Sequence, residues 1–237
     1  MSMILPCYLA MTAAEFAGSM PKKPYIAWLS CHFSTYHTGL SNIPRFLPAG
    51  AMAVLDDSTP IDHHDPDRIC TQLKEMIDDF QLSGVLLDFQ RPDVDECQRL
   101  CKILSQALPC PVGVTEYYAK GLHCPVLLSV PLRVDIHTIA SRWKDRELWL
   151  EVVLEAQQIT VTKEGAQVIA RSVDPLPEPY HKDSALHCQY HWHMQEDAAV
   201  FTVQRDFEEL KGLLDTASKL GVTRAIGLYQ QLGDFMT

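Results

Sequence analysis

The sequence predicts an α/β protein whose parallel strands close into a (β/α)8 barrel, and three features of the chain lead to that expectation. Apolar runs of strand length alternate with segments of helical periodicity, as in proteins with parallel sheets. One run, residues 84–87, is almost wholly apolar and ends in the polar tip Asp88-Phe89-Gln90, an arrangement typical of barrel enzymes. The length of 237 residues suits one barrel, so we expect residues 1–237 to form a single domain.

The first half of the chain gives strands and helices in regular alternation. Pro66 directly follows Asp65 in the first turn of a helix, where its missing N–H costs nothing, and apolar residues recur along one face up to Phe80. The third strand runs into two consecutive acids, Asp56 and Asp57. The expected elements are strands at 4–11, 25–33, 51–55 and 84–87 and helices at 13–20 and 65–80.

The middle of the chain predicts that the barrel is reduced or distorted. A helix that starts near Asp93 ends before Pro109, because the residue before a proline disfavours helical backbone. The fifth and sixth strands are expected at 111–118 and 125–132. The gap between them, 119–124, is too short for a crossover helix.

A β-hairpin insertion is expected within residues 148–173, before the seventh strand of the barrel. β-branched residues on both sides of the turn at Lys163-Glu164-Gly165 indicate the hairpin. The last third then predicts a proline-rich loop at 174–179, strands at 187–193 and 199–203, a helix at 207–220 and a final strand at 221–229.

Two segments of the chain resemble family 18 of the glycoside hydrolases, the chitinase-like proteins. The fourth-strand pattern of that family reads aromatic-Asp-Gly-apolar-Asp-apolar-Asp-aromatic-Glu. The matching positions here are Gly84, Val85, Leu87, Asp88 and Phe89. Ser83 and Leu86 replace the first two acids, and Gln90 stands where the family has its proton donor. The closing strand, helix, glycine turn and strand at 199–229 also resemble the family, with Tyr229 where it usually presents a Trp.

The resemblance implies a TIM-like barrel that binds sugars, and Gln90 implies that hydrolysis is impaired. Glycoside cleavage needs a protonated carboxyl group beside the leaving oxygen, and a carboxamide has no titratable proton. Family members whose Glu has become Gln or Leu are generally lectin-like or storage proteins. We therefore expect a pseudoenzyme that binds a carbohydrate or another small polar ligand, and whether the chain is an enzyme stays open.

The site is expected at the carboxyl ends of the barrel strands. Aromatic rings stack on sugar rings, while carboxylates and amides bind hydroxyl groups. The catalytic candidates are Asp88, Gln90 and Glu116. The ligand-binding candidates are Tyr8, Asp56, Asp57, Tyr117, His191, His193 and Tyr229. Two alternatives remain: an active glycoside hydrolase whose acid has moved to Glu116 or to the Asp56-Asp57 pair, and a non-enzymatic interaction scaffold.

Composition narrows the classes of partner. A formal charge of −10 without any basic run argues against nucleic acid and favours neutral or cationic ligands. No apolar run reaches the length of a membrane span, and the start of the chain lacks the features of a signal peptide, so we expect a cytoplasmic protein. The scattered cysteines and the paired histidines are expected to pack or to form hydrogen bonds, so no metal or cofactor is predicted.

Overall fold

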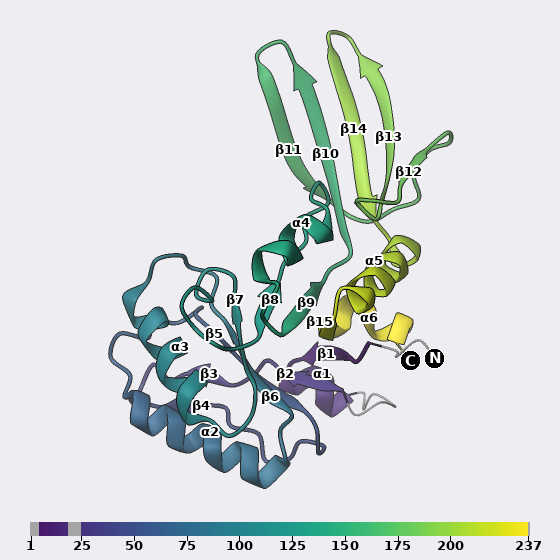
Figure 1. The fold of residues 1–237 in the computed structure, drawn as a ribbon. Helices are drawn as coiled ribbons and strands as arrows, with labels where there is room; N and C mark the ends of the chain where they lie inside the picture. The colour runs from purple at the N-terminus through teal and green to yellow at the C-terminus, as the bar shows by residue number, and fades with distance from the viewer. Residues whose placement is uncertain (1–4, 19–24, 237) are drawn as a thin grey trace.

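The computed structural model describes residues 5–18 and 25–236, and eight of the described strands form a closed barrel (Figure 1). Every neighbouring pair in this barrel is parallel. The barrel strands are β1 (Cys7–Met11), β2 (Ile26–Trp28), β5 (Met52–Asp56), β6 (Gly84–Asp88), β7 (Val112–Thr115), β8 (Val126–Leu128), β9 (Leu148–Val152) and β15 (Val222–Leu228). The predicted (β/α)8 barrel is confirmed.

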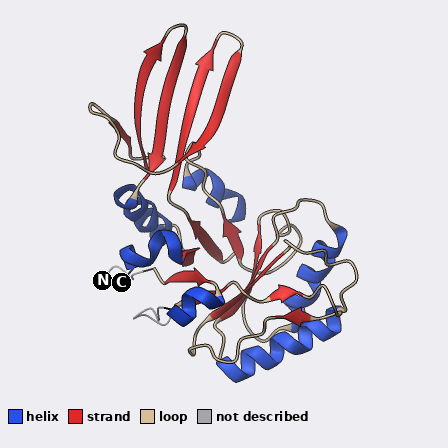
Figure 2. Cartoon of the chain, turned by 180° about the vertical axis from the view of Figure 1, so that it is seen from behind, coloured by secondary structure: helices blue, strands red, loops and turns tan. Residues whose placement is uncertain are grey.

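Helices lie on the outside of the barrel (Figure 2). They are α1 (Ala13–Gly18), α2 (Pro66–Phe80), α3 (Asp95–Ala107), α4 (Ile136–Ala140), the 3₁₀ turn η1 (Ser141–Trp143), α5 (Phe207–Lys219) and α6 (Tyr229–Met236). The side chain of Asp65 caps α2 by accepting from the N–H of Asp67. The connection between β7 and β8 holds no helix, so the barrel has its full set of strands and is reduced only in its helices.

The interior of the barrel is filled at the amino end of its strands. Trp149 is fully buried there, and a Cβ atom added at Gly113 would lie 2.3 Å from the Trp149 ring, so the glycine makes room for the indole. The guanidinium of Arg224 lies 4.8 Å from the centre of the same ring and donates to the backbone oxygen of Ser83. This end of the barrel therefore offers no space for a ligand.

The second expected strand, 25–33, is divided in the structure. The chain leaves the barrel after β2, and β3 (His32–Phe33) pairs antiparallel with β4 (Leu40–Ser41) in a separate two-stranded sheet. The side chain of Ser30 accepts from the backbone N–H of Ala13 at 2.8 Å and so joins the segment after β2 to the start of α1. The mostly apolar segment 25–33 thus changes direction after β2 and does not form one strand.

The insertion is larger than the expected hairpin and lies after the seventh strand. β9, at the start of the segment predicted as hairpin, is the seventh strand of the barrel, whereas β10 (Glu155–Thr162) and β11 (Gly165–Arg171) form the hairpin. The strand expected at 199–203 is β14 (Ala198–Arg205), which pairs with β10 rather than with a barrel strand. Which sheet each of these strands joins depends on pairing with strands far away in the sequence, and the local pattern of residues does not encode that pairing.

The complete insertion is a five-stranded antiparallel sheet that projects from the barrel (Figure 1). Its order is β11, β10, β14, β13 (Cys188–Gln195) and β12 (His181–Asp183). The side chain of Arg205 ties its base to the barrel, because Nη1 donates to the backbone oxygen of Val130 at 2.8 Å. No helix within the described residues is long and apolar enough to cross a membrane.

Candidate functional site

Two cavities open at the carboxyl ends of the barrel strands and share the residues Gln90, Leu127 and Glu151. One, of about 360 Å³, has an apolar floor and a rim that includes Asp88. The other, of about 420 Å³, extends towards the loop after β7 and η1. Because they share lining residues, we treat them as one cleft and call it the barrel mouth.

Asp88 is the acidic residue whose protonation the barrel mouth alters most. It ends β6 with its side chain turned inward, and Nε2 of Gln90 donates a hydrogen bond to its Oδ1. Burial is the main cause of a pKa of about 6 for the Asp88 carboxyl; the charges of Glu151, Asp56 and Asp57 act in the same direction, and the hydrogen bond from the Gln90 amide opposes them. Asp88 therefore gains or loses its proton at mildly acidic pH.

The backbone at Gln90 is held by Asp57, which directly follows the neighbouring strand β5. Its carboxylate accepts from the backbone N–H groups of Gln90 at 3.0 Å and Arg91 at 2.9 Å, and from Nε of Arg91 at 3.0 Å. Burial opposes ionisation, but these hydrogen bonds and the Arg91 charge outweigh it and lower the pKa of Asp57. Asp57 is thus occupied in positioning the loop, although it was expected to bind ligand.

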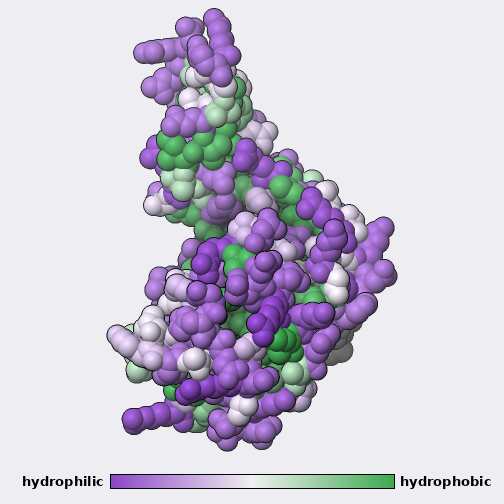
Figure 3. Space-filling view, turned by 90° about the vertical axis from the view of Figure 1, so that its left-hand side faces the viewer, coloured by the Kyte–Doolittle hydropathy of each residue, from purple (hydrophilic) through white to green (hydrophobic). Residues whose placement is uncertain are grey.

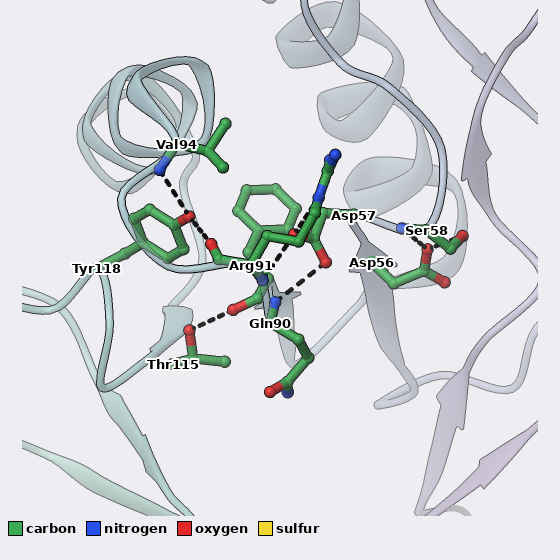
Figure 4. A network of polar contacts seen from close by, with 9 residues as sticks. Asp56, Asp57, Ser58, Gln90, Arg91, Val94, Thr115 and Tyr118 are labelled. Carbon is green, nitrogen blue, oxygen red and sulfur yellow. Dashed lines mark hydrogen bonds and ion pairs between the residues drawn. The ribbon is translucent and has the colours of Figure 1, made fainter.

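Further contacts fix the same loop from the side of β7 (Figure 4). Thr115 donates to the backbone oxygen of Phe89 at 2.7 Å, and the hydroxyl of Tyr118 donates to the backbone oxygen of Arg91. The side chain of Gln90 points away from Asp57 in Figure 4 and lines the barrel mouth. The network therefore presents the Gln90 amide on a rigid support.

The second wall of the barrel mouth combines acidic and aromatic side chains. Glu116 accepts from Nε1 of Trp143 at 2.8 Å, and both residues line the larger cavity with Tyr117. Tyr117 is 59% exposed, so one face of its ring is free to stack on a ligand. Arg142 also lines this wall and places one cation beside the carboxylates.

The structure brings Asp88, Gln90, Glu116 and Tyr117 together and places four other candidates elsewhere. Tyr8 lies inside the barrel at the filled end, where its hydroxyl pairs with Oγ of Ser83 at 3.0 Å. His191 and His193 lie on β13 of the inserted sheet, with ring centres 5.9 Å apart. Tyr229 begins α6 instead of ending the last strand, and it does not line either cavity.

Asp56 ends β5 with its carboxylate already engaged. Its Oδ2 is 3.4 Å from Nδ1 of His32, and its Oδ1 accepts from the backbone N–H of Ser58 at 2.9 Å. Neither cavity of the barrel mouth is lined by Asp56. Its charge nevertheless reaches the site, because it contributes to the raised pKa of Asp88.

Glu151 and Trp143 are two of the site residues that the sequence pattern did not reveal. Glu151 lies on β9, inward-facing like Trp149 two residues earlier, and contributes to both cavities. The alternation of Trp149 and Glu151 with apolar residues indicates a strand, but the same pattern also fits the hairpin that the sequence predicts at 148–173. Trp143 follows a short helix, and nothing in its local sequence points to the barrel mouth.

The described residues offer no group of three or more His, Cys, Asp or Glu side chains that could hold a metal ion. Most of the cysteines are buried. Burial alone raises the pKa of the Cys31 thiol to about 12. Cys31 therefore packs as a small apolar residue, because a buried thiol with a raised pKa is a poor nucleophile and a poor metal ligand.

The barrel has the fold of family 18 glycoside hydrolases, as comparison with solved structures shows. A family 18 chitinase from Cycas revoluta has a TM-score of 0.61 at 8% identity and covers 98% of this chain and 97% of its own. A family 18 N-acetylglucosaminidase from Paenibacillus barengoltzii reaches 0.60 at 9% identity, with 94% of each chain covered. The spore cortex-lytic enzyme SleL of Bacillus cereus reaches 0.54 at 9% identity, over 94% of this chain and 70% of that one.

Comparison by sequence gives a different outcome. No family model matches the chain, and no curated protein is similar enough to match. The likeness therefore lies in the three-dimensional arrangement of the backbone. At amino-acid identities of 8 to 9%, the similarity establishes the fold alone. The chemistry depends on the side chains of the barrel mouth.

Proposed function

We propose that this protein binds an oligosaccharide in the barrel mouth and that its ability to hydrolyse the bound sugar is impaired. The observation that carries the proposal is the pairing of Asp88 with Gln90 inside an open cleft. An amide and a carboxyl group together supply both donors and acceptors for sugar hydroxyl or acetamido groups. The apolar floor and the exposed Tyr117 ring supply the surface on which a sugar ring packs.

Impaired hydrolysis follows from the group at position 90. The amide of Gln90 lines the cleft and has no proton to give to a leaving oxygen. Asp57 is a poor substitute because its hydrogen bonds lower its pKa, whereas an acid catalyst requires a raised one. The barrel mouth thus keeps the means to hold a sugar and lacks the expected means to cleave it.

Two similar structures hold an oligosaccharide, and one of them does so with a Gln in place of a Glu. A class V chitinase mutant from Cycas revoluta is in complex with (GlcNAc)3, and a chitinase from that plant in which one of two substitutions replaces Glu by Gln is in complex with (GlcNAc)4. These proteins cover 98% of the present chain at TM-scores of 0.60. By analogy, Gln90 is compatible with a bound oligosaccharide.

A second candidate function, hydrolysis with a relocated acid, has its own observation in its favour. Glu116 and Glu151 line the same cavity as Gln90, and the Asp88 pKa of about 6 allows that carboxyl group to carry a proton at mildly acidic pH. The interaction-scaffold alternative lacks such an observation, because it requires a filled barrel mouth and the cleft is open.

The experiment is calorimetric titration with (GlcNAc)4, its de-N-acetylated counterpart and peptidoglycan fragments, followed by mass spectrometry for products. We expect binding without product, lost in Asp88→Ala and kept in the matched control Gln98→Ala, an exposed residue of α3. Product that disappears in Glu116→Gln or Glu151→Gln would establish the relocated acid instead. Neither heat nor product with any of these glycans would overturn the carbohydrate proposal.

A further inference from the structure

The inserted sheet ends at a regular strand whose outer edge is open. Among the described strands β11 pairs only with β10, and all seven of its residues are exposed. Its register with β10 runs from Gly165 to Arg171 without a bulge. Figure 3 looks onto the side of the molecule where this edge lies and shows hydrophobic residues gathered in the projecting part above the barrel. The outward N–H and C=O groups of such a strand are a template for another strand.

The opposite edge of the same sheet is protected at its base, where β12 covers residues 188–190 of β13, whereas residues 191–195 of β13 pair only with β14 within the described part of the chain. β12 has only three residues, one of them Lys182, and the proline-rich segment 174–179 precedes it. Short length, lysine and nearby proline are the usual devices that keep an edge from pairing. β11 has none of them: it contains no proline, and its only charged residue, Arg171, stands at its end.

One face of the sheet beside this edge is apolar and uncovered. Residues paired across antiparallel strands point to the same face, so Val168 shares its face with Ile159, and Ile159 with Phe201. Val161 and Val168 on this face are 39% and 44% exposed. Apart from the residues at its base, the face consists of Ala166, Val168, Ala170, Gln157, Ile159, Val161, Ala199, Phe201, Val203, Tyr190, Trp192 and Met194.

We propose that β11 pairs antiparallel with β11 of a second copy of this chain, about a two-fold axis at Val168, to form one continuous sheet. An axis perpendicular to the sheet keeps the apolar faces of both copies on the same side, and centring it on Val168 lets all seven residues pair. The proposal is independent of the sugar site and concerns an interaction surface outside the barrel mouth.

The charges around the edge permit this contact, although each chain carries −10 overall. The hairpin 155–171 contains two acids, Glu155 and Glu164, and two bases, Lys163 and Arg171, so it is locally neutral. In the proposed register, Arg171 faces Gly165 of the other copy, directly beside Glu164 of that copy. The attraction favours the Val168-centred register, since a shift centred on Gln167 would oppose Arg171 and Lys163.

The position of the sheet leaves the rest of the molecule free to function. β10 to β14 project away from the barrel in Figures 1 and 2, so the barrel does not cover the β11 edge. Pairing through this edge would keep both barrel mouths accessible and would place two sugar sites on one particle. Such a particle binds a long glycan more tightly than a single copy does, without any new contact.

The test is sedimentation velocity of the full chain over a wide concentration range, comparing wild type with Val168→Lys and Val161→Lys. We expect a concentration-dependent dimer that Val168→Lys weakens by about tenfold or more, because two lysines then meet at the axis. The control Val161→Lys lies on the same face one strand inward and should leave the dimer unchanged. A wild-type monomer at all concentrations, or equal loss in both variants, would overturn the proposal.

A charge exchange provides a second readout that does not depend on the lysines. Arg171→Glu should weaken the dimer, and adding Glu164→Arg should restore it, because the two residues approach each other only across the proposed axis. Failure of the double variant to recover, with both variants folded by circular dichroism, would contradict the register.

Discussion

The two ends of the barrel interior come from the same strands and have opposite properties. At the amino end, Trp149, Arg224 and Tyr8 fill the space, and the Arg224 guanidinium lies over both rings. At the carboxyl end, Asp88, Gln90 and Glu151 surround an open cleft. Both Trp149 and Glu151 are inward-facing residues of β9, two positions apart. The strand β9 thus stabilises the fold through Trp149 and contributes Glu151 to the barrel mouth.

The largest effect should come from the filled end. Trp149→Ala removes a fully buried indole, and we expect a loss of about 3 to 5 kcal/mol of unfolding free energy by chemical denaturation. Trp143→Ala, the matched change in the barrel mouth, should cost clearly less stability and weaken glycan binding. Equal destabilisation by the two substitutions would contradict the conclusion that the amino end of the barrel stabilises the fold more than the barrel mouth does.

Asp57 tests whether the loop beneath Gln90 is preorganised. Asp57→Asn removes acceptor capacity from a buried network, and we expect a loss of about 1 to 3 kcal/mol near neutral pH. The folded pKa of Asp57 is lowered, so its stabilisation is present above the unfolded value and disappears as pH falls through the folded one. The variant and wild type should therefore converge in acid, as thermal melts over a pH series would reveal.

Asp88 should behave in the opposite way. Its folded pKa of about 6 lies above its ordinary value, so the ionised form destabilises the fold. Asp88→Asn should raise the unfolding free energy on the order of 2 kcal/mol at pH above 6, with no gain below about pH 4. A pH-independent effect of Asp88→Asn on the melting temperature would show that the raised pKa is absent.

The sequence predicted those parts of the molecule whose signals are local. The apolar run that ends at Asp88 and the Asp65-Pro66 helix start specified β6 and α2 closely, because burial and capping leave marks within a few residues. The pair Asp88 and Gln90, together with Glu116 and Tyr117, was placed at the cleft for the same reason: each follows a recognisable strand.

The misplaced residues depend on contacts between distant segments. β9 was assigned to the hairpin because an alternating strand reads the same in a barrel and in an antiparallel sheet until its partners are known. Tyr229 was placed at a strand end, whereas α6 already begins there. Asp57 was expected to bind ligand, but its partners are backbone N–H groups 33 and 34 residues away, which no local pattern reveals.

The central claim is that the barrel mouth holds a sugar and that the amide of Gln90 prevents its cleavage. The most direct measurement compares wild type and Gln90→Glu for (GlcNAc)4 binding by calorimetry and for product by mass spectrometry. The account predicts binding by both proteins and product only from Gln90→Glu, because the new carboxyl group lies beside Asp88 in the same cleft. Hydrolysis by wild type at a rate that Gln90→Glu leaves unchanged, or no binding by either protein, would contradict it.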